Sequence, residues 1–197
     1  MEILKVNLNA TGSNNGTSWD NAYQDLQSAI NAATSGDQIW VAADTYTPGD
    51  TRENSFELKD GVKIYGGFTG KEENLNDRDI KNNVTILSGN IGTQTDKSDN
   101  SYAVVKLSSG TATLDGLTIQ DGNSNKDGGG VYNDGNLTLK NVVVRDNQAA
   151  DDGGGIRNNG TITIIDSTIA DNTSIGTSLT SGGGGLINTG ESATIIN

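Results

Sequence analysis

The sequence predicts an all-β protein, a right-handed parallel β-helix (solenoid) that starts with an amphipathic capping helix. Three observations lead to this prediction. The stretch "GGGVYNDGNLTL" from Gly128 returns as "GGGIRNNGTITI" from Gly153, 25 residues later. Only 32% of the 197 residues are hydrophobic and 27 are glycine, which suits a narrow core along one axis better than a wide one. One N-terminal segment has the apolar spacing of an α-helix.

Each repeat is interpreted as one circuit of the solenoid. Twenty-five residues span about 80 Å at ~3.3 Å per residue, which is too long for a hairpin strand and suits one turn around a small cross-section. A third glycine triplet opens at Gly183 after 30 residues, and the five extra residues fit between Asp171 and Gly182. The triplets are expected at a corner where a Cβ would obstruct stacking or φ is positive. The predicted inward columns are Ala112/Leu137/Ile162, Leu114/Leu139/Ile164, Ile119/Val144/Ile169 and, as a weaker match, Leu117/Val142/Ser167.

The capping helix is predicted near residues 20–34. Its apolar residues recur at helical spacing, and Ser18 or Asp20 is expected to cap its start and Gly36 its end. A solenoid needs such a cap because its first coil otherwise exposes an open strand edge. The apolar positions are Ala22, Leu26, Ala29, Ile30 and Ala33.

We expect a single domain over residues 1–197 with three parts. The N-terminal cap and first strand occupy 1–50, irregular early coils occupy 51–110, and regular GGG coils of about 25–30 residues occupy 111–197. The chain stops at "ESATIIN", inside an expected strand, so we interpret the last coil as incomplete and the chain as a fragment. An open strand edge there makes end-to-end self-association a prediction.

Composition excludes several classes of function. The net charge is −12 with no basic run, so nucleic-acid binding is not expected. Histidine and cysteine are absent, which removes Ser-His-Asp and Cys-His catalysis, zinc sites built from those residues, and disulfides. No cofactor is required by any motif. No window is apolar enough for a signal peptide or a membrane-spanning helix, so no membrane insertion is expected and an export signal is expected elsewhere in a longer protein.

Several stretches carry a resemblance to a known family that covers essentially the whole chain and is specific in the N-terminal cap. The stretches are "GSNNGTSWDNAYQDLQSAINAATSGDQIWVAADTYTP", "SFELKDGVKIYGGFTGKEENLNDRD" and "NVTILSGNIG", followed by the GGG coils. Together they resemble bacterial surface proteins of the pectin-lyase-like superfamily, the parallel β-helix repeat proteins of large cyanobacterial and planctomycete exoproteins. Asp44 departs from the pattern, which usually has glycine there. The resemblance implies the β-helix fold and an extracellular or cell-surface location.

Asp121, Asp146 and Asp171 form a predicted column at one corner. Carboxylates about 4.8 Å apart repel by ~3.5 kcal/mol at an effective dielectric of 20, so the column needs solvent or a bound cation. If a cation binds there, oxygen-only ligands favour calcium. The alternative is a column of solvated turn residues.

A polysaccharide lyase or glycoside hydrolase of the same superfamily is the alternative enzymatic interpretation. Arg145 next to Asp146 resembles the catalytic arginine over an acidic cluster that pectate lyases use. The enzyme would depend on these two residues together with the pair Asp151 and Asp152. The Gly-His-Gly pattern of the polygalacturonase type is impossible without histidine. A plain turn is the competing interpretation, because a fold alone carries no function.

Two outward features suggest binding. Thr113, Thr138 and Thr163 form a ladder that raises ice binding as a minor alternative, although threonine is also simply favourable on an exposed strand. Tyr132, whose column neighbour is Arg157, is a candidate glycan contact. The aromatic side chains able to stack on sugar rings are Trp19, Trp40, Tyr46, Tyr65, Tyr102 and Tyr132, of which the two tryptophans are expected to pack in the cap.

The sequence therefore predicts a non-catalytic structural or adhesive segment of a bacterial exoprotein, with polysaccharide or a cell-surface glycan as the candidate partner. A stacked solenoid supplies a stiff rod with long flat faces.

Overall fold

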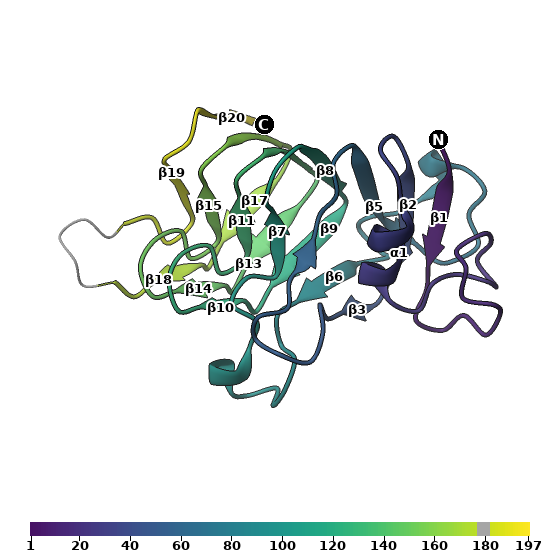
Figure 1. Cartoon of the computed structure of the whole chain (residues 1–197), viewed down its shortest axis with the longest axis horizontal. Helices are drawn as coiled ribbons and strands as arrows, with labels where there is room; N and C mark the ends of the chain where they lie inside the picture. The colour runs from purple at the N-terminus through teal and green to yellow at the C-terminus, as the bar shows by residue number, and fades with distance from the viewer. Residues whose placement is uncertain (177–181) are drawn as a thin grey trace.

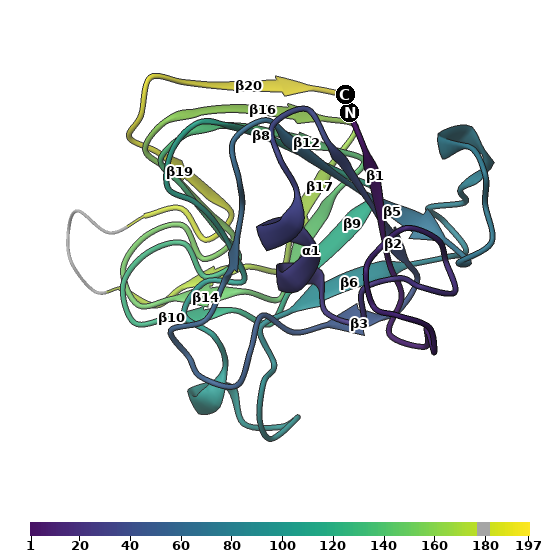
Figure 2. The same cartoon turned by 45° about the vertical axis from the view of Figure 1, so that its right-hand side comes forward.

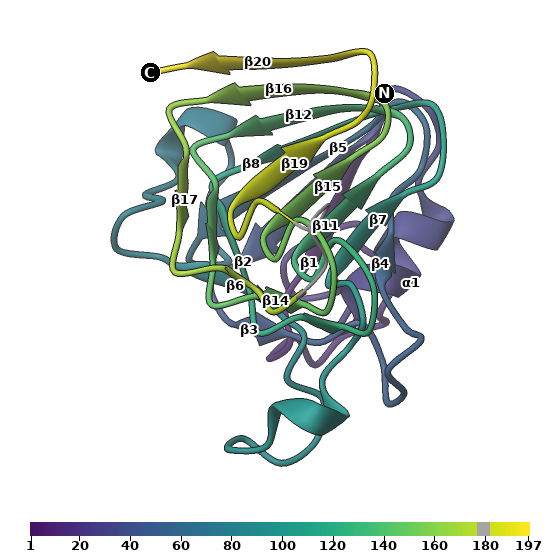
Figure 3. The same cartoon turned by 90° about the vertical axis from the view of Figure 1, so that its left-hand side faces the viewer.

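The computed structural model describes residues 1–176 and 182–197, which form four parallel β-sheets wound into one solenoid (Figure 1). Viewed from the C-terminal end in Figure 3, the chain runs counterclockwise while it advances toward the viewer. This sense defines a right-handed coil, as expected for parallel strands joined by crossovers. The predicted right-handed parallel β-helix is confirmed.

Each sheet stacks one strand per coil, and a regular coil visits sheets A, B, D and C in turn. Sheet A consists of β1 (Ile3–Val6), β2 (Gln38–Ala42), β5 (Val62–Phe68), β8 (Thr111–Asp115), β12 (Asn136–Lys140), β16 (Thr161–Ile165) and β20 (Ser192–Ile196). Sheet B consists of β3 (Thr45–Tyr46), β6 (Thr85–Ser88), β9 (Leu117–Gln120), β13 (Val143–Arg145) and β17 (Thr168–Ala170). Sheet C consists of β4 (Phe56–Glu57), β7 (Val105–Leu107), β11 (Val131–Asn133), β15 (Ile156–Asn158) and β19 (Leu186–Asn188). Sheet D consists of β10 (Asn123–Ser124), β14 (Gln148–Ala149) and β18 (Thr173–Ser174).

The strand register confirms the 25-residue repeat. Leu114 pairs with Leu139 and Leu139 with Ile164, and the same offset holds in sheets B and D. The offset stays at 25 between β14 and β18 but rises to 30 between β15 and β19, so the five extra residues lie between Ser174 and Leu186. Of that predicted loop, residues 177–181 lie outside the described part of the chain.

The glycine triplets form the corner between sheets D and C. Gly128, Gly153 and Gly183 each have φ between +62° and +70°, where an L side chain is strained. The third glycine of a triplet is needed for space: a Cβ on Gly130 would lie 2.5 Å from the carbonyl oxygen of Gly155. Both predicted reasons for the triplets are therefore confirmed.

Two stacks of asparagine side chains fasten neighbouring coils at other corners. Asn133 Nδ2 donates to Asn158 Oδ1 at 2.5 Å, and Asn158 Nδ2 donates to Asn188 Oδ1 at 2.5 Å. In the second stack Asn147 Nδ2 donates to Asn172 Oδ1 at 3.0 Å. Asn133, Asn147 and Asn158 are almost completely buried, so these bonds satisfy amides that burial would otherwise penalise.

The capping helix is present but shorter than predicted. Helix α1 (Leu26–Ala32) starts at Asp25, whose carboxylate accepts from Ser28 N at 2.6 Å, and ends at Ala33. The prediction of Ser18 or Asp20 as the N-cap and Gly36 as the C-cap was wrong. The segment before the helix is instead a turn followed by a single β-bridge of Tyr23 to β1, in which Tyr23 N donates to the carbonyl of Lys5 at 2.8 Å.

Helix α1 lies across the N-terminal end of the solenoid and packs on β1, β2 and β4 (Figure 2). Leu26, Ala29 and Ile30 join the main hydrophobic core. Lys59 Nζ donates to the carbonyls of Asn31 and Ala33, at 2.9 and 2.6 Å, which satisfies free acceptors at the helix C-terminus. The helix therefore acts as the predicted cap.

A second aromatic cluster covers the outer face of sheet A near the N-terminus. Alternation places Ile39 and Val41 in the core and Trp40 on the opposite face, where it stacks on Phe68 with ring centroids 4.8 Å apart. Trp19 packs on the same ring at 5.5 Å. The expected packing role of both tryptophans is confirmed.

Candidate functional site

The outer face of sheet C carries a row of side chains that differs from the rows on the other sheets. Register aligns Glu57 with Lys106, Lys106 with Tyr132, Tyr132 with Arg157, and Arg157 with Ile187. Their strand neighbours Val105 and Val131 are buried in the core, so the row faces outward by alternation. Tyr132 and Arg157 are thus neighbours on an outward face, as the sequence predicted.

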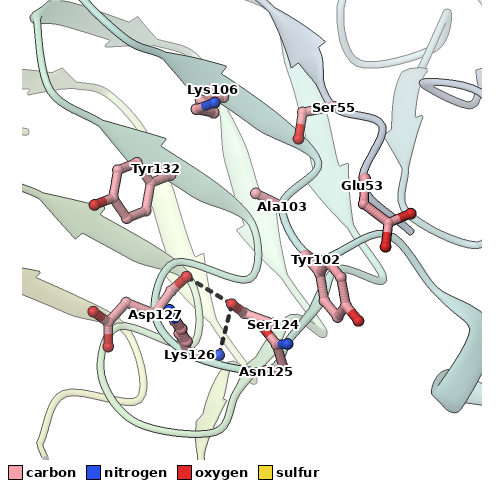
Figure 4. A pocket seen from close by; sticks show the side chains of 10 residues that line it. All are labelled: Glu53, Ser55, Tyr102, Ala103, Lys106, Ser124, Asn125, Lys126, Asp127 and Tyr132. Carbon is pink, nitrogen blue, oxygen red and sulfur yellow. Dashed lines mark hydrogen bonds between the residues drawn. The ribbon is translucent and has the colours of Figure 1, made fainter. Parts of the chain in front are cut away.

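A cavity of about 350 Å³ opens beside this row, where sheet C meets the turn that follows β10 (Figure 4). This volume is near the lower end of the ~300–1,000 Å³ typical of ligand pockets. Figure 4 shows Tyr102 and Tyr132 on opposite sides of the cavity, with Ala103 between them. The remaining lining residues are Glu53, Ser55, Lys106, Ser124, Asn125, Lys126 and Asp127. We call this the sheet C pocket.

The ring of Tyr102 is fixed by a contact with the guanidinium of Arg52. The Arg52 guanidinium lies 4.3 Å from the centroid of the Tyr102 ring, a cation–π distance. Its Nε donates to the carbonyl of Asn100 at 2.8 Å and its Nη2 to the carbonyl of Asn123 at 2.9 Å. Because Arg52 bonds two different coils, it fixes the tyrosine relative to both.

Tyr132 is held through its hydroxyl, which accepts from Asn159 Nδ2 at 3.0 Å. Asn159 in turn accepts from Arg157 Nε at 2.7 Å. Arg157 lies beside the pocket rather than in its lining, and its Nη1 is 3.4 Å from Asp152 Oδ2 and 3.8 Å from Asp127 Oδ2. Arg157 therefore positions Tyr132 through Asn159, and its part in ligand binding stays a prediction.

The turn between β10 and β11 is closed by Ser124. Its hydroxyl donates to the carbonyl of Asp127 at 2.8 Å and accepts from Lys126 N at 3.2 Å, as Figure 4 shows. These bonds give the turn a fixed shape. Lys126 and Asn125 are presented at the pocket edge as a result.

The four residues of the enzymatic alternative fall into two separate pairs. Arg145, at the end of β13, bonds Asp146 Oδ2 at 2.9 Å and Gln120 Oε1 at 2.7 Å. Asp151 and Asp152 lie instead in the turn before β15, where Asp152 pairs with Arg157. The arginine of the first pair is thus engaged with its own neighbours on the sheet B side.

The aspartate column at the corner between sheets B and D has a conformational role. Asp121, Asp146 and Asp171 have φ of 63°, 57° and 54°, a region that aspartate tolerates better than most residues. Asp121 Oδ2 accepts from Ser88 Oγ at 3.0 Å and from Gln120 Nε2 at 2.8 Å. Within residues 1–176 and 182–197, no group of three or more carboxylates is arranged to hold a metal ion.

The threonine ladder continues for one coil more than the sequence indicated. Thr113 pairs with Thr138, Thr138 with Thr163, and Thr163 with Thr194 on the outer face of sheet A. Lys63 takes the same position in the preceding coil. The row is thus a short strip on one face.

Comparison with known proteins supports the fold and little beyond it. No family model matches the chain, and no curated protein matches it either. Among solved structures, a crystal structure of pectate lyase Pel9A is similar, with a TM-score of 0.61, 18% sequence identity and 89% of this chain covered. The chain spans 41% of that protein. The fold is therefore that of the pectate lyase-like parallel β-helices, and the bacterial surface-protein type remains a prediction.

Sequence reasoning missed most of the sheet C pocket. Tyr132 was singled out and Tyr102 was one of several aromatic candidates, but Glu53, Lys106 and Lys126 carried no signal. The pocket combines two irregular early coils with the first regular one, and no repeat relates those positions. The usable signal was the tyrosine in "SYAVVKL", one coil before "GGGVYN".

Proposed function

We propose that this chain is a non-catalytic, adhesive β-helix segment that binds polysaccharide on the outer face of sheet C. The observation that carries the proposal is the sheet C pocket, in which two supported tyrosines lie on opposite sides of an apolar centre at Ala103. Tyrosine offers a rigid surface that is apolar on its ring and polar at its hydroxyl, which suits a sugar ring. Weak binding, with Kd on the order of 0.1–1 mM per site, is expected.

The shape of the protein supports an adhesive role. Sheet A stacks seven strands and sheet C five, at about 4.8 Å per coil. Such a stack is stiff and presents parallel rows along its length, so a long polymer can lie across several coils. We also propose an extracellular or cell-surface location without membrane insertion, and no nucleic-acid partner, because the net charge is −12 without a basic run. Among the described residues, no helix is long and apolar enough to span a membrane.

End-to-end self-association remains part of the proposal. Strand β20 lies at one edge of sheet A, and its side chains are exposed, including Ile195 and Ile196. Exposed strand edges with apolar side chains favour pairing with another chain. Light scattering over a range of protein concentrations would detect it as a rise in mass.

A polysaccharide lyase or hydrolase is the second candidate, favoured by the likeness to a pectate lyase fold. Arg145 and Asp152 are the residues on which it would depend. Their present partners, Asp146 and Arg157, are the obstacle, because a catalytic base or acid must reach the substrate rather than a neighbour.

One panel of polysaccharides separates the two candidates. Polygalacturonate, alginate, galactan and xylan are assayed for unsaturated and reducing ends, with and without calcium, and for retardation of the protein in affinity gels. We expect retardation without product, lost in Tyr132→Ala and kept in the sheet A control Asn136→Ala, an exposed position outside the threonine ladder. Turnover that disappears in Asp152→Ala or Arg145→Ala would overturn the proposal in favour of an enzyme.

For the metal, we propose that any cation dependence is for calcium at the corner of Asp121, Asp146 and Asp171. Asp121 also lines a hollow of about 340 Å³ with the oxygen-bearing side chains of Ser88, Asn90 and Gln120. Such neutral oxygens around a carboxylate suit calcium. Equal melting temperatures in chelator and in millimolar calcium would remove calcium from the proposal.

A further inference from the structure

We infer that the glycan held by the sheet C pocket is a neutral polysaccharide and not a polyuronate. The inference rests on the proposed function and adds the chemical class of the ligand. It follows from the balance of charge at the pocket, from the apolar floor and from the kind of polar groups at the edge.

The charges at the pocket cancel. The lining contains two basic side chains, Lys106 and Lys126, and two acidic ones, Glu53 and Asp127. Lys106 Nζ is 3.1 Å from Glu57 Oε1, so its charge is already compensated by the adjacent strand. The whole chain carries −12, which adds a repulsive background for any polyanion at low salt.

The nearest additional cations are also engaged. Arg157 pairs with Asp152 and Asp127, and Arg52 bonds two backbone carbonyls while it covers one face of Tyr102. A carboxylate on every sugar would need a row of uncompensated cations, because arginine and lysine supply the charge-assisted bonds that hold carboxylates. The two cations in the outer row of sheet C are instead already paired with carboxylates, Lys106 with Glu57 and Arg157 with Asp152 and Asp127.

The centre of the pocket suits an uncharged ring. Ala103 lies between the two tyrosines in Figure 4, so the floor is apolar and flanked by aromatic rings. Ser55 and Asn125 add neutral donors and acceptors at the edge, which match sugar hydroxyls. Glu53 can accept from a hydroxyl but would repel a carboxylate.

Calorimetric titration at 50 and 500 mM NaCl tests the inference on the protein as it exists. The probes are hexasaccharides of galactan, xylan and cellulose as neutral ligands, and hexagalacturonate as the anionic ligand. We expect at least one neutral probe to bind with Kd changed less than about twofold by salt, since screening acts only on charges. We expect Tyr132→Ala to weaken that binding at least about tenfold. Asn136→Ala, at an exposed position of sheet A outside the threonine ladder, should leave it within about twofold.

A charge variant gives an independent readout. Glu53 is exposed, so Glu53→Lys should fold normally and give the pocket a net positive charge. We expect this variant to bind hexagalacturonate at least about fivefold better than the parent at 50 mM NaCl, with the gain lost at 500 mM.

The outcomes distinguish failure of the neutral ligand class from failure of glycan binding itself. Tight, salt-sensitive binding of hexagalacturonate by the parent, abolished by Tyr132→Ala, would overturn the neutral class while glycan binding stands. Binding of no probe at either salt concentration, with correctly folded protein by circular dichroism, would overturn glycan binding and the inference with it.

Discussion

The coils before residue 111 and the coils after it build one solenoid by different means. The later coils repeat the same devices at the same offsets: a glycine triplet at one corner and stacked asparagines at two others. The earlier coils have neither. They hold sheet A with a bulge in the pairing of β2 and β5, an external aromatic cluster, and a largely buried ion pair, 2.9 Å long, from Arg78 to Asp115 of the first regular coil. The later coils are thus held together by repeated contacts, and the earlier coils by contacts that occur once each.

The candidate site lies where the two regions meet. Tyr102 and Lys106 come from the last irregular coil, and Lys126 and Tyr132 come from the first regular one. A surface that repeats in every coil cannot be concave at one place only. The irregular loops supply the wall that the regular coils lack.

The largest loss of stability is expected where a glycine of the regular coils has no room for a Cβ atom. Gly130→Ala would place a Cβ 2.5 Å from the Gly155 carbonyl oxygen, so we expect a loss of about 3 kcal/mol or more in urea unfolding. The matched control in the early region is Gly36→Asn, where φ is +93° but no atom lies within 4 Å. Asparagine tolerates such φ values, so a cost under about 1 kcal/mol is expected. Equal losses of unfolding free energy in the two variants would contradict a steric need for glycine that is specific to the regular coils.

The asparagine stacks should give the next largest effect. Asn158→Ala removes donors to Gly160 O at 3.0 Å, Ser192 O at 3.1 Å and Asn188 Oδ1 at 2.5 Å in a buried corner. We expect a loss of about 2–3 kcal/mol in the free energy of unfolding, since buried acceptors lose their partners. Asn136→Ala, an exposed position on β12, should stay within about 0.5 kcal/mol.

A smaller effect sharpens the account of the N-terminal region. Asp25→Ala removes the carboxylate that caps α1 and should cost about 1 kcal/mol. Asp20→Ala should change the unfolding midpoint little, because the helix does not begin there. The reverse order of the two variants would restore the longer helix predicted from the sequence.

The last prediction depends on pH. Hydrogen bonds from Glu2 N and from Thr34 lower the pKa of Asp37 to about 2, so its carboxylate is favoured in the folded state. A folded pKa below the unfolded value of ~3.9 stabilises the protein above that pH, and the contribution is lost as pH falls through about 2. The difference in melting temperature between the parent and Asp37→Asn should therefore be constant from pH 7 to 5 and shrink toward pH 2. A difference that persists at pH 2 would contradict this cause.

The regular coils could be predicted well from the sequence because a residue of the same type recurs at most stacked positions in three successive coils. Leu114, Leu139 and Ile164 need no structure to be aligned, and their register fixes every other residue of the coil. The start of α1 was predicted wrongly for a physical reason. Ala22 fits the helical spacing, yet the adjacent Tyr23 gains more by pairing with the edge strand β1, and one-dimensional spacing cannot weigh these options.

The candidate site was predictable only in part. The outward placement of Tyr132 beside Arg157 follows from alternation and register. The pocket around it does not, because it depends on Arg52 reaching the carbonyls of Asn100 and Asn123 across 48 and 71 residues of chain. Such long-range bonds between loops leave no period in the sequence.

The asparagine stacks contribute a dipole along the axis of the solenoid. In both stacks the side-chain NH₂ group of one coil points to the oxygen of the coil that follows it: Asn133 to Asn158, Asn158 to Asn188, and Asn147 to Asn172. Because these amide dipoles all run the same way, they add along the axis, and each bond polarises the next. The two ends of the rod therefore differ in electrostatic potential for a reason separate from the net charge.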